Sequence, residues 1–237
     1  MEFYSPDIQT IAGPVRILPQ KGSVSGGTGR PVNSYAILRD GHSILVDAPF
    51  SWCLDGIADL AAGGYGPGAL VLSHKDLCAS GDAFEELTRR YDLSVLLHPA
   101  DQDAPEAVET RLAFEDPVDH PLLKKDGIEV IEMPGHTPGS ILLYLAEADG
   151  ILLAGDSAVG PGPEQPADPP RLERPKMDED DDKIFCAAWP DLLKRRPVAA
   201  VLPLHGQIYR RQDLGADRFI EVLAHIWTGA PMDPSGG

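Results

Sequence analysis

The chain has 237 residues, a hydrophobic content of 43% and a formal net charge of −17. This length suits one large domain or at most two small ones, and the apolar content is ordinary for a globular protein. The negative charge disfavours proteins that bind nucleic acids or anionic membranes, because such binding needs a basic surface.

The sequence also predicts the compartment. No apolar run approaches the length that spans a bilayer, and the first residues lack the basic start and long apolar core of a secretory signal. The three cysteines have unpatterned spacings, which argues against a disulfide framework and for a reducing compartment. We therefore expect a cytoplasmic protein that acts on a small molecule and binds neither nucleic acid nor membrane. The sequence does not indicate an oligomeric state.

Strand and helix signals alternate in the first half of the chain. Residues 1–31 are rich in glycine and predict an irregular segment. Asp40-Gly41 lies between two short apolar runs and predicts a hairpin. Ser80 is a suitable N-cap for a helix that extends to Tyr91. Further expected elements are a helix over 54–62, buried strands over 69–72 and 95–97, and loop with a short helix over 101–126.

The second half is organised around the loop Pro134-Gly135-His136-Thr137-Pro138-Gly139-Ser140. Its glycines and prolines preset the backbone, so the loop can hold the His136 imidazole at a strand end with little entropy to lose. Asp149-Gly150 predicts a hairpin that returns Asp156 to the same edge. The stretch Val159 to Asp182 is expected to be an exposed loop. Strands are expected over 128–133, 141–145, 151–154 and 199–202, and helices over 184–194 and 216–227.

A histidine or aspartate follows each of five apolar strands. One such residue is usually structural, but several at the carboxyl ends of strands in an α/β fold predict a site at a common rim. His42, His120 and His225 lie in a turn, a polar loop and a helix, and we expect no function for them. The five candidates are His74, His98, His136, Asp156 and His205.

At these residues the sequence resembles the metallo-β-lactamase superfamily. The landmarks are the His136 loop, Ala154-Gly155-Asp156 and Leu202-Pro203-Leu204-His205-Gly206, together with Ser73-His74 and the segment from Asn33 to Asp47. The resemblance implies an α/β fold, a four-layer αββα sandwich, over residues 1–237 as one domain, with a metal site at the sheet edges.

The first metal motif of the family departs from its pattern here. The family has His-any-His-any-Asp-His, whereas this chain has His74-Lys75-Asp76-Leu77-Cys78-Ala79. The resemblance implies a first metal position formed by His74, Asp76, His136 and Asp156. The second position keeps Asp156 and His205 but has Ala79, which cannot bind metal, and Cys78, expected to be a small buried side chain. We therefore expect one zinc or iron ion, with complete loss of metal as the rival.

Three functions follow from this departure. The first is a single-metal hydrolase of a small ester, thioester or lactone-like substrate, in which Asp76 is a ligand, a general base or only a helix cap. The second is a mononuclear iron oxygenase, because His74, His136 and Asp156 match the two-His-one-carboxylate set and resemble the ligands of the persulfide dioxygenase branch. The third is a non-catalytic protein that binds a ligand in the old cleft. Asp47 is expected to tie its hairpin to the site loops.

Overall fold

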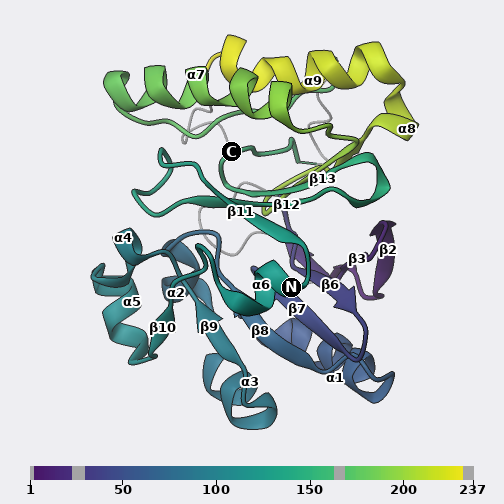
Figure 1. Ribbon diagram of the computed structural model, residues 1–237, viewed down its shortest axis with the longest axis vertical. Coiled ribbons are helices and arrows are strands. Elements are labelled where there is room, and N and C mark those ends of the chain that lie inside the picture. Colours follow the sequence, from purple (N-terminus) through teal and green to yellow (C-terminus); the bar gives the residue numbers. More distant parts are fainter. Residues whose placement is uncertain (1–2, 23–29, 163–168, 232–237) are drawn as a thin grey trace.

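The computed structural model describes residues 3–22, 30–162 and 169–231, and Figure 1 shows them as layers. Two large sheets pack face to face in the middle of the molecule. Helices cover the outer face of each sheet, at the top and at the bottom of the view. The expected four-layer αββα sandwich is therefore confirmed.

The first large sheet carries most of the N-terminal half. Its strand order is β10-β9-β8-β7-β6-β3-β2. The hairpin predicted at Asp40-Gly41 joins β6 to β7, and Gly41 has a φ of +77°, which glycine adopts without strain. The strands are β2 (Gln9–Ala12), β3 (Val15–Ile17), β6 (Tyr35–Arg39), β7 (His42–Val46), β8 (Pro67–Val71), β9 (Ser94–Leu96) and β10 (Phe114–Glu115).

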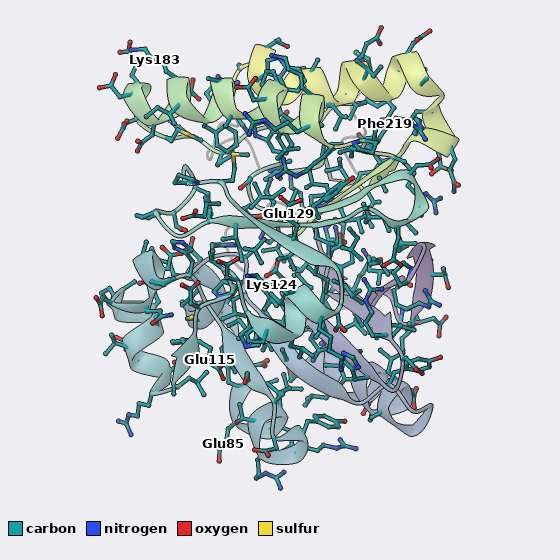
Figure 2. The ribbon with its side chains drawn as sticks, in the orientation of Figure 1. Glu85, Glu115, Lys124, Glu129, Lys183 and Phe219 are labelled. Carbon is teal, nitrogen blue, oxygen red and sulfur yellow. The ribbon has the colours of Figure 1, made fainter. Side chains whose placement is uncertain are left out.

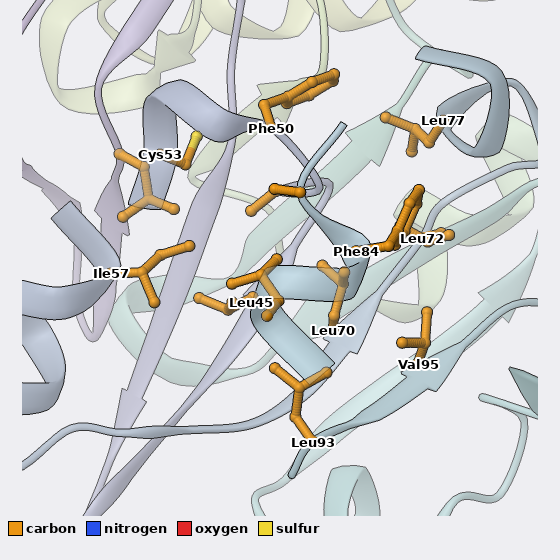
Figure 3. Packing of buried hydrophobic residues seen from close by; sticks show 14 of the residues in the cluster. Leu45, Phe50, Cys53, Ile57, Leu70, Leu72, Leu77, Phe84, Leu93 and Val95 are labelled. Atoms are coloured by element: carbon orange, nitrogen blue, oxygen red, sulfur yellow. The ribbon is translucent and has the colours of Figure 1, made fainter. Parts of the chain in front are cut away.

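Helices α1 (Leu54–Ala62) and α3 (Phe84–Tyr91) cover the outer face of this sheet (Figure 1). Ile57 of α1 belongs to the same buried cluster as Leu45 and Leu70 of the sheet. Figure 3 shows this packing, with Val95 and Leu93 extending it toward α3. The predicted helix over 54–62 is confirmed.

The second large sheet carries the C-terminal half, in the order β11-β12-β13-β14-β15. Helices α7 (Glu179–Arg195) and α9 (Ala216–Thr228) cover its outer face. Phe219 of α9 lies between the helix and the sheet, whereas Lys183 of α7 extends outward (Figure 2). The strands are β11 (Ile128–Glu132), β12 (Ile141–Leu145), β13 (Ile151–Gly155), β14 (Ala200–Pro203) and β15 (Tyr209–Arg210).

Successive residues of β12 and β13 belong to different cores. Leu143 and Leu153 join the cluster between the two sheets, and Leu142 and Leu152 join the cluster beneath α7 and α9. Both faces of these strands are covered, which explains why they are continuous apolar runs rather than alternating ones.

Shorter elements complete the fold. A third sheet has the order β1-β4-β5. Among the described residues, no helix combines the length and the apolar character that a membrane crossing needs. The elements are β1 (Phe3–Ser5), β4 (Gln20–Gly22), β5 (Pro31–Val32), η1 (Ser51–Cys53), α2 (Asp76–Ser80), α4 (Pro99–Gln102), α5 (Pro105–Thr110), α6 (Pro121–Lys125), η2 (Glu147–Asp149) and α8 (Arg211–Leu214).

Two expectations for the first half were wrong in whole or in part. The segment 1–31 is not irregular where it is described, because β3 pairs with β6 and β2 pairs with β3; residues 23–29 lie outside the described residues. The helix predicted from Ser80 is present as α3 and ends at Tyr91 as predicted, but it begins at Phe84. Ser80 instead ends α2, Gly81 after it is extended, and the carboxylate of Asp82 accepts hydrogen bonds from the backbone N–H and hydroxyl of Ser51.

The connection after Asp156 also differs from the expected exposed loop. Val159 pairs with Glu173, and the side chains of Leu172 and Arg174 are buried; residues 163–168 lie outside the described part of the chain. The acidic run at its end begins α7 instead of preceding it. Asp178 is the N-cap, and its carboxylate accepts hydrogen bonds from two backbone N–H groups of the first turn.

The predicted hairpin after β12 is present with a longer turn. Leu145 pairs with Ile151, so the turn spans residues 146–150 and includes η2. Gly150 has a φ of +98°, and a Cβ there would lie 1.8 Å from the carbonyl oxygen of Pro197. Only glycine fits this close approach, which explains the Asp-Gly signal.

Candidate metal centre

Strand ends deliver four of the predicted side chains to one place. His74 follows β8, His136 follows β11, Asp156 follows β13 and His205 follows β14. Asp156 Oδ2 lies 3.6 Å from His74 Nε2, 3.7 Å from His136 Nε2 and 3.6 Å from His205 Nε2. One carboxylate oxygen from the second sheet therefore lies at the centre of three imidazoles, one of which comes from the first sheet.

The spacing of three of these groups suits one metal ion. Within the described residues, His74, His136 and Asp156 each offer a ligand atom, and these atoms lie within 4.8 Å of one another. Two ligands bound at about 2.1 Å lie at most about 4.2 Å apart, so small side-chain adjustments close the set. Asp156 Oδ1 is buried and has no hydrogen-bond partner in the described structure, and His136 Nε2 is buried with the Asp76 carboxylate at 3.2 Å but no hydrogen bond of good geometry. Unpartnered buried donors and acceptors are costly, and a cation among them would remove that cost. The donor set fits zinc or iron.

Local structure fixes the first imidazole. His74 Nδ1 lies 3.0 Å from the hydroxyl of Ser73, which leaves Nε2 directed at Asp156. Gly155 permits this arrangement, because a Cβ at its φ of +50° would lie 2.4 Å from the Ser73 hydroxyl oxygen. Burial lowers the pKa of His74 to about 4. The imidazole is therefore neutral at pH 7, as a metal ligand must be.

Asp47 and Asp101 hold the site loops in place. Asp47 Oδ1 accepts a 2.7 Å hydrogen bond from the Ser73 backbone N–H, which is the expected structural role. Asp101 is completely buried, and its carboxylate accepts hydrogen bonds from the Lys75 and Gly139 N–H groups and from the Thr137 hydroxyl. Asp101 thus joins the loop of His74 to the loop of His136. It lies in a polar stretch without any pattern, and sequence reasoning missed it.

Asp76 lies beside the cluster at the start of α2. Its Oδ2 is 3.2 Å from His136 Nε2 and its Oδ1 is 3.4 Å from Lys75 Nζ. The adjacent His136 imidazole holds the pKa of Asp76 well below its usual range. Burial opposes the charged form of His136, but the carboxylates of Asp76 and Asp156 outweigh it and raise the His136 pKa. Asp76 is half exposed, so its carboxylate also faces solvent.

The strand-end candidate His98 and the motif residue Cys78 lie elsewhere. His98 does not reach the cluster; its Nδ1 accepts from the Ala100 N–H at the start of α4, and its Nε2 lies 3.1 Å from Glu132. Cys78 packs into the core against the first sheet, and burial raises the pKa of its thiol to about 12, as expected for a structural residue. The remaining histidines contact partners away from the cluster: His42 contacts Asp126, His120 contacts Glu115, and His225 contacts the Leu172 carbonyl.

A pocket of about 380 Å³ lies over the cluster. Metal-site candidates form one wall, and apolar side chains that the sequence analysis did not single out form the other. Phe50 and Trp52 are stacked, with ring centres 4.3 Å apart and planes inclined by 7°. The described lining consists of Val32, Phe50, Trp52, His74, Asp76, Leu77, Ser80, Asp82, His136, Asp156, Leu204 and His205.

Comparison with solved structures finds the same fold in metallo-beta-lactamases. The DIM-1 metallo-beta-lactamase has 16% identity and a TM-score of 0.68, with 96% of this chain and 97% of that chain covered. A metallo-beta-lactamase from Pontibacter korlensis has 17% identity and a TM-score of 0.62, with 94% and 99% covered. FIM-1 from Pseudomonas aeruginosa, in its mono-zinc form, has 17% identity and a TM-score of 0.63, with 93% and 94% covered. At these identities the likeness concerns the fold.

The sequence itself places the chain in a family. No curated protein matches it closely enough to count as a relative. The profile of the metallo-beta-lactamase superfamily matches residues 27–205, which include every residue of the cluster described above. The chain therefore belongs to the metallo-beta-lactamase superfamily.

Proposed function

We propose that the protein is a metal-dependent hydrolase with one metal ion, held by His74, His136 and Asp156, that cleaves a small ester, thioester or lactone-like bond. The observation that carries the proposal is the convergence of three ligand atoms within 4.8 Å at the pocket wall. The buried Asp156 Oδ1, which has no hydrogen-bond partner among the described residues, supports it.

The residues at the family's second metal position favour a single ion. The residues in register there are Cys78, which is buried in the core with a raised thiol pKa, and Ala79, which has no ligand atom. Only Asp156 and His205 remain, and a stable zinc site takes three or more protein ligands. The mono-zinc form of FIM-1 is a precedent for one ion on this fold.

The metal, when bound, would lower the pKa of a water molecule and polarise the carbonyl that the water attacks. In hydrolysis the water oxygen bonds to the acyl carbon, the ester or thioester bond breaks, and the leaving oxygen or sulfur takes up a proton. Asp76 is ionised and partly exposed beside His136, so its carboxylate is placed to accept a hydrogen bond from the attacking water and to orient it. His205 lines the same pocket, with its Nε2 3.6 Å from Asp156 Oδ2, and we assign it the role of donating a hydrogen bond toward the leaving group.

The cysteines and the net charge bear on the compartment of the protein and on the class of its substrate. The free thiols of Cys53, Cys78 and Cys186 support a reducing compartment, and we place the protein in the cytoplasm. The net charge of −17 supports a small-molecule substrate over nucleic acid.

The test is hydrolysis of 4-nitrophenyl butyrate by protein stripped with a chelator and then supplied with zinc or iron(II). We expect turnover to return with metal in wild type and in His98→Ala, and to fall at least about 100-fold in His136→Ala. His98→Ala is the matched control, because this histidine lies outside the cluster. Iron-dependent oxygen consumption without hydrolysis would favour the oxygenase, and binding of no metal at all would leave only the non-catalytic alternative.

A further inference from the structure

The pocket that holds the candidate centre has one wall whose composition bears on the substrate. Phe50 and Trp52 form a flat aromatic pair, and Leu77 and Leu204 extend the apolar surface. Phe50 is 4% exposed, and both it and Leu77 belong to the core against the first sheet; Figure 3 shows them at one end of that cluster. Because the core holds these side chains, little conformational freedom is lost when a flat ligand packs against them.

The described lining of the same pocket carries more negative than positive side chains. Its described lining contains the carboxylates of Asp76, Asp82 and Asp156 and neither lysine nor arginine. The stretches outside the described residues contain no lysine or arginine either, so they cannot add one. Lys75 contacts the carboxylates of Asp76 and Glu106, outside the lining. Lys21 is also outside the described lining, with its Nζ 5.3 Å from the centre of the Trp52 ring. Three carboxylates exceed the two charges of a divalent ion, so an additional negative charge on the substrate would meet a negative wall.

We infer that the substrate carries a flat, apolar and uncharged acyl group, which packs against Phe50 and Trp52 while its carbonyl faces His74, His136 and Asp156. Acyl groups that end in a carboxylate are rejected. The volume of about 380 Å³ suits a small aromatic ester or thioester. This inference rests on the proposed hydrolase function, since it assigns the substrate class of that site.

The first experiment compares three 4-nitrophenyl esters on the zinc-loaded wild-type protein: 4-phenylbutyrate with an aromatic end, butyrate with none, and hemiglutarate with a carboxylate end. We expect kcat/KM to be highest for phenylbutyrate and lowest for hemiglutarate, with steps on the order of tenfold. Trp52→Leu should remove most of the advantage of phenylbutyrate over butyrate. Tyr65→Leu changes an exposed aromatic residue away from the pocket and should keep it.

A second variant should remove the charge preference. Ser80 is an exposed lining residue at the end of α2, so Ser80→Lys adds a cation to the pocket without disturbing the core. It should raise kcat/KM for hemiglutarate relative to butyrate by about tenfold. Ser80→Gln adds similar length without charge and should leave that ratio at its wild-type value.

Failure of this inference is distinguishable from failure of the proposed function. Ligand-observed NMR with 4-phenylbutyramide and glutaric acid monoamide measures binding without turnover. Hydrolysis of all three esters with no preference, or with hemiglutarate preferred, would overturn the substrate class and leave the hydrolase intact. Binding of phenylbutyramide alone, with no ester cleaved, would support the pocket preference and remove the hydrolase. Neither binding nor cleavage would overturn both.

Discussion

The replacement of Asp101 tests how the loops of the candidate metal centre are held in position. Its buried carboxylate accepts hydrogen bonds of 3.0 Å from the Lys75 N–H, 2.9 Å from the Gly139 N–H and 2.6 Å from the Thr137 hydroxyl. Gly139 is required for this contact, because a Cβ there would lie 2.6 Å from the Asp101 carboxyl carbon. Asp101→Ala therefore leaves several polar groups without partners in the interior.

The expected cost follows from those groups. Each buried donor left unpaired costs about 1–3 kcal/mol, and since the three share one site we expect a total of about 3–5 kcal/mol. For a chain of this length that lowers Tm by roughly 6–20 °C. The loops of His74 and His136 also lose their connection, so zinc affinity should fall about 10–100-fold.

The assay is urea unfolding of the metal-free protein together with zinc titration against a competing chelator. Asp103→Ala is the matched control, because this neighbour is exposed and makes no hydrogen bond of its own to the site loops. A free energy of unfolding within about 0.5 kcal/mol of wild type in Asp101→Ala would refute the energetic reasoning. Unchanged zinc affinity would refute the positioning role.

Three further predictions concern the rest of the fold. Burial raises the pKa of the Cys53 thiol to about 12, so iodoacetamide at pH 8 should modify it only after unfolding, as peptide mass spectrometry would show. Arg174→Leu removes the two hydrogen bonds that lower the pKa of Asp182, together with those to the carbonyls of Ile226 and Gly229. The ion pair stabilises the protein above the unfolded pKa of Asp182, near 4, so part of the loss of about 1–3 kcal/mol in urea unfolding should disappear as the pH falls below that value. In Gly150→Ala the new Cβ would meet backbone atoms, so we expect the free energy of unfolding to fall by more than about 3 kcal/mol. In Gly41→Ala the new Cβ has open space around it, so the expected loss is about 1 kcal/mol. Equal losses in calorimetry would contradict this reasoning.

The sequence predicted the parts of the fold whose signals are local and strong. The apolar runs of β12 and β13 and the Asp-Gly turn before Ile151 are visible without tertiary information, because strands covered on both faces must be apolar throughout. The loop around His136 carries enough Gly and Pro to mark a rigid turn. The resemblance supplied the layer order, which local patterns alone do not contain.

The remainder depends on partners far away in the sequence. The strand Val15–Ile17 exists because β6 offers an edge for it, and its own residues carry no distinct signal. Ser80 resembles an N-cap, but it ends α2; the carboxylate of Asp82 bonds to Ser51, and the predicted helix begins only at Phe84. Asp101 gives no local sign of its role, since its three donors lie 26 to 38 residues away.

The candidate site was predicted in outline and refined by the structure. Four predicted residues follow strand ends that lie close together: His74, His136, Asp156 and His205. His98 also follows a strand end of the first sheet, but its imidazole accepts a hydrogen bond from the Ala100 N–H at the start of α4. A count of histidines after strands cannot separate these cases. The stacked pair of Phe50 and Trp52 in the pocket cannot be recognised from a single sequence either, because two aromatic residues close together can equally belong to the hydrophobic core.

The central claim is one metal ion on this site, and its most direct test is the metal content of the purified protein. Wild type and His136→Ala would be loaded with excess zinc, passed through gel filtration and analysed for zinc per chain. We expect about one equivalent in wild type and almost none in His136→Ala, because His136 Nε2 is one of the converging ligand atoms. Two equivalents in wild type would contradict the single-ion site, and equal zinc in both proteins would contradict the assignment of His136 as a ligand.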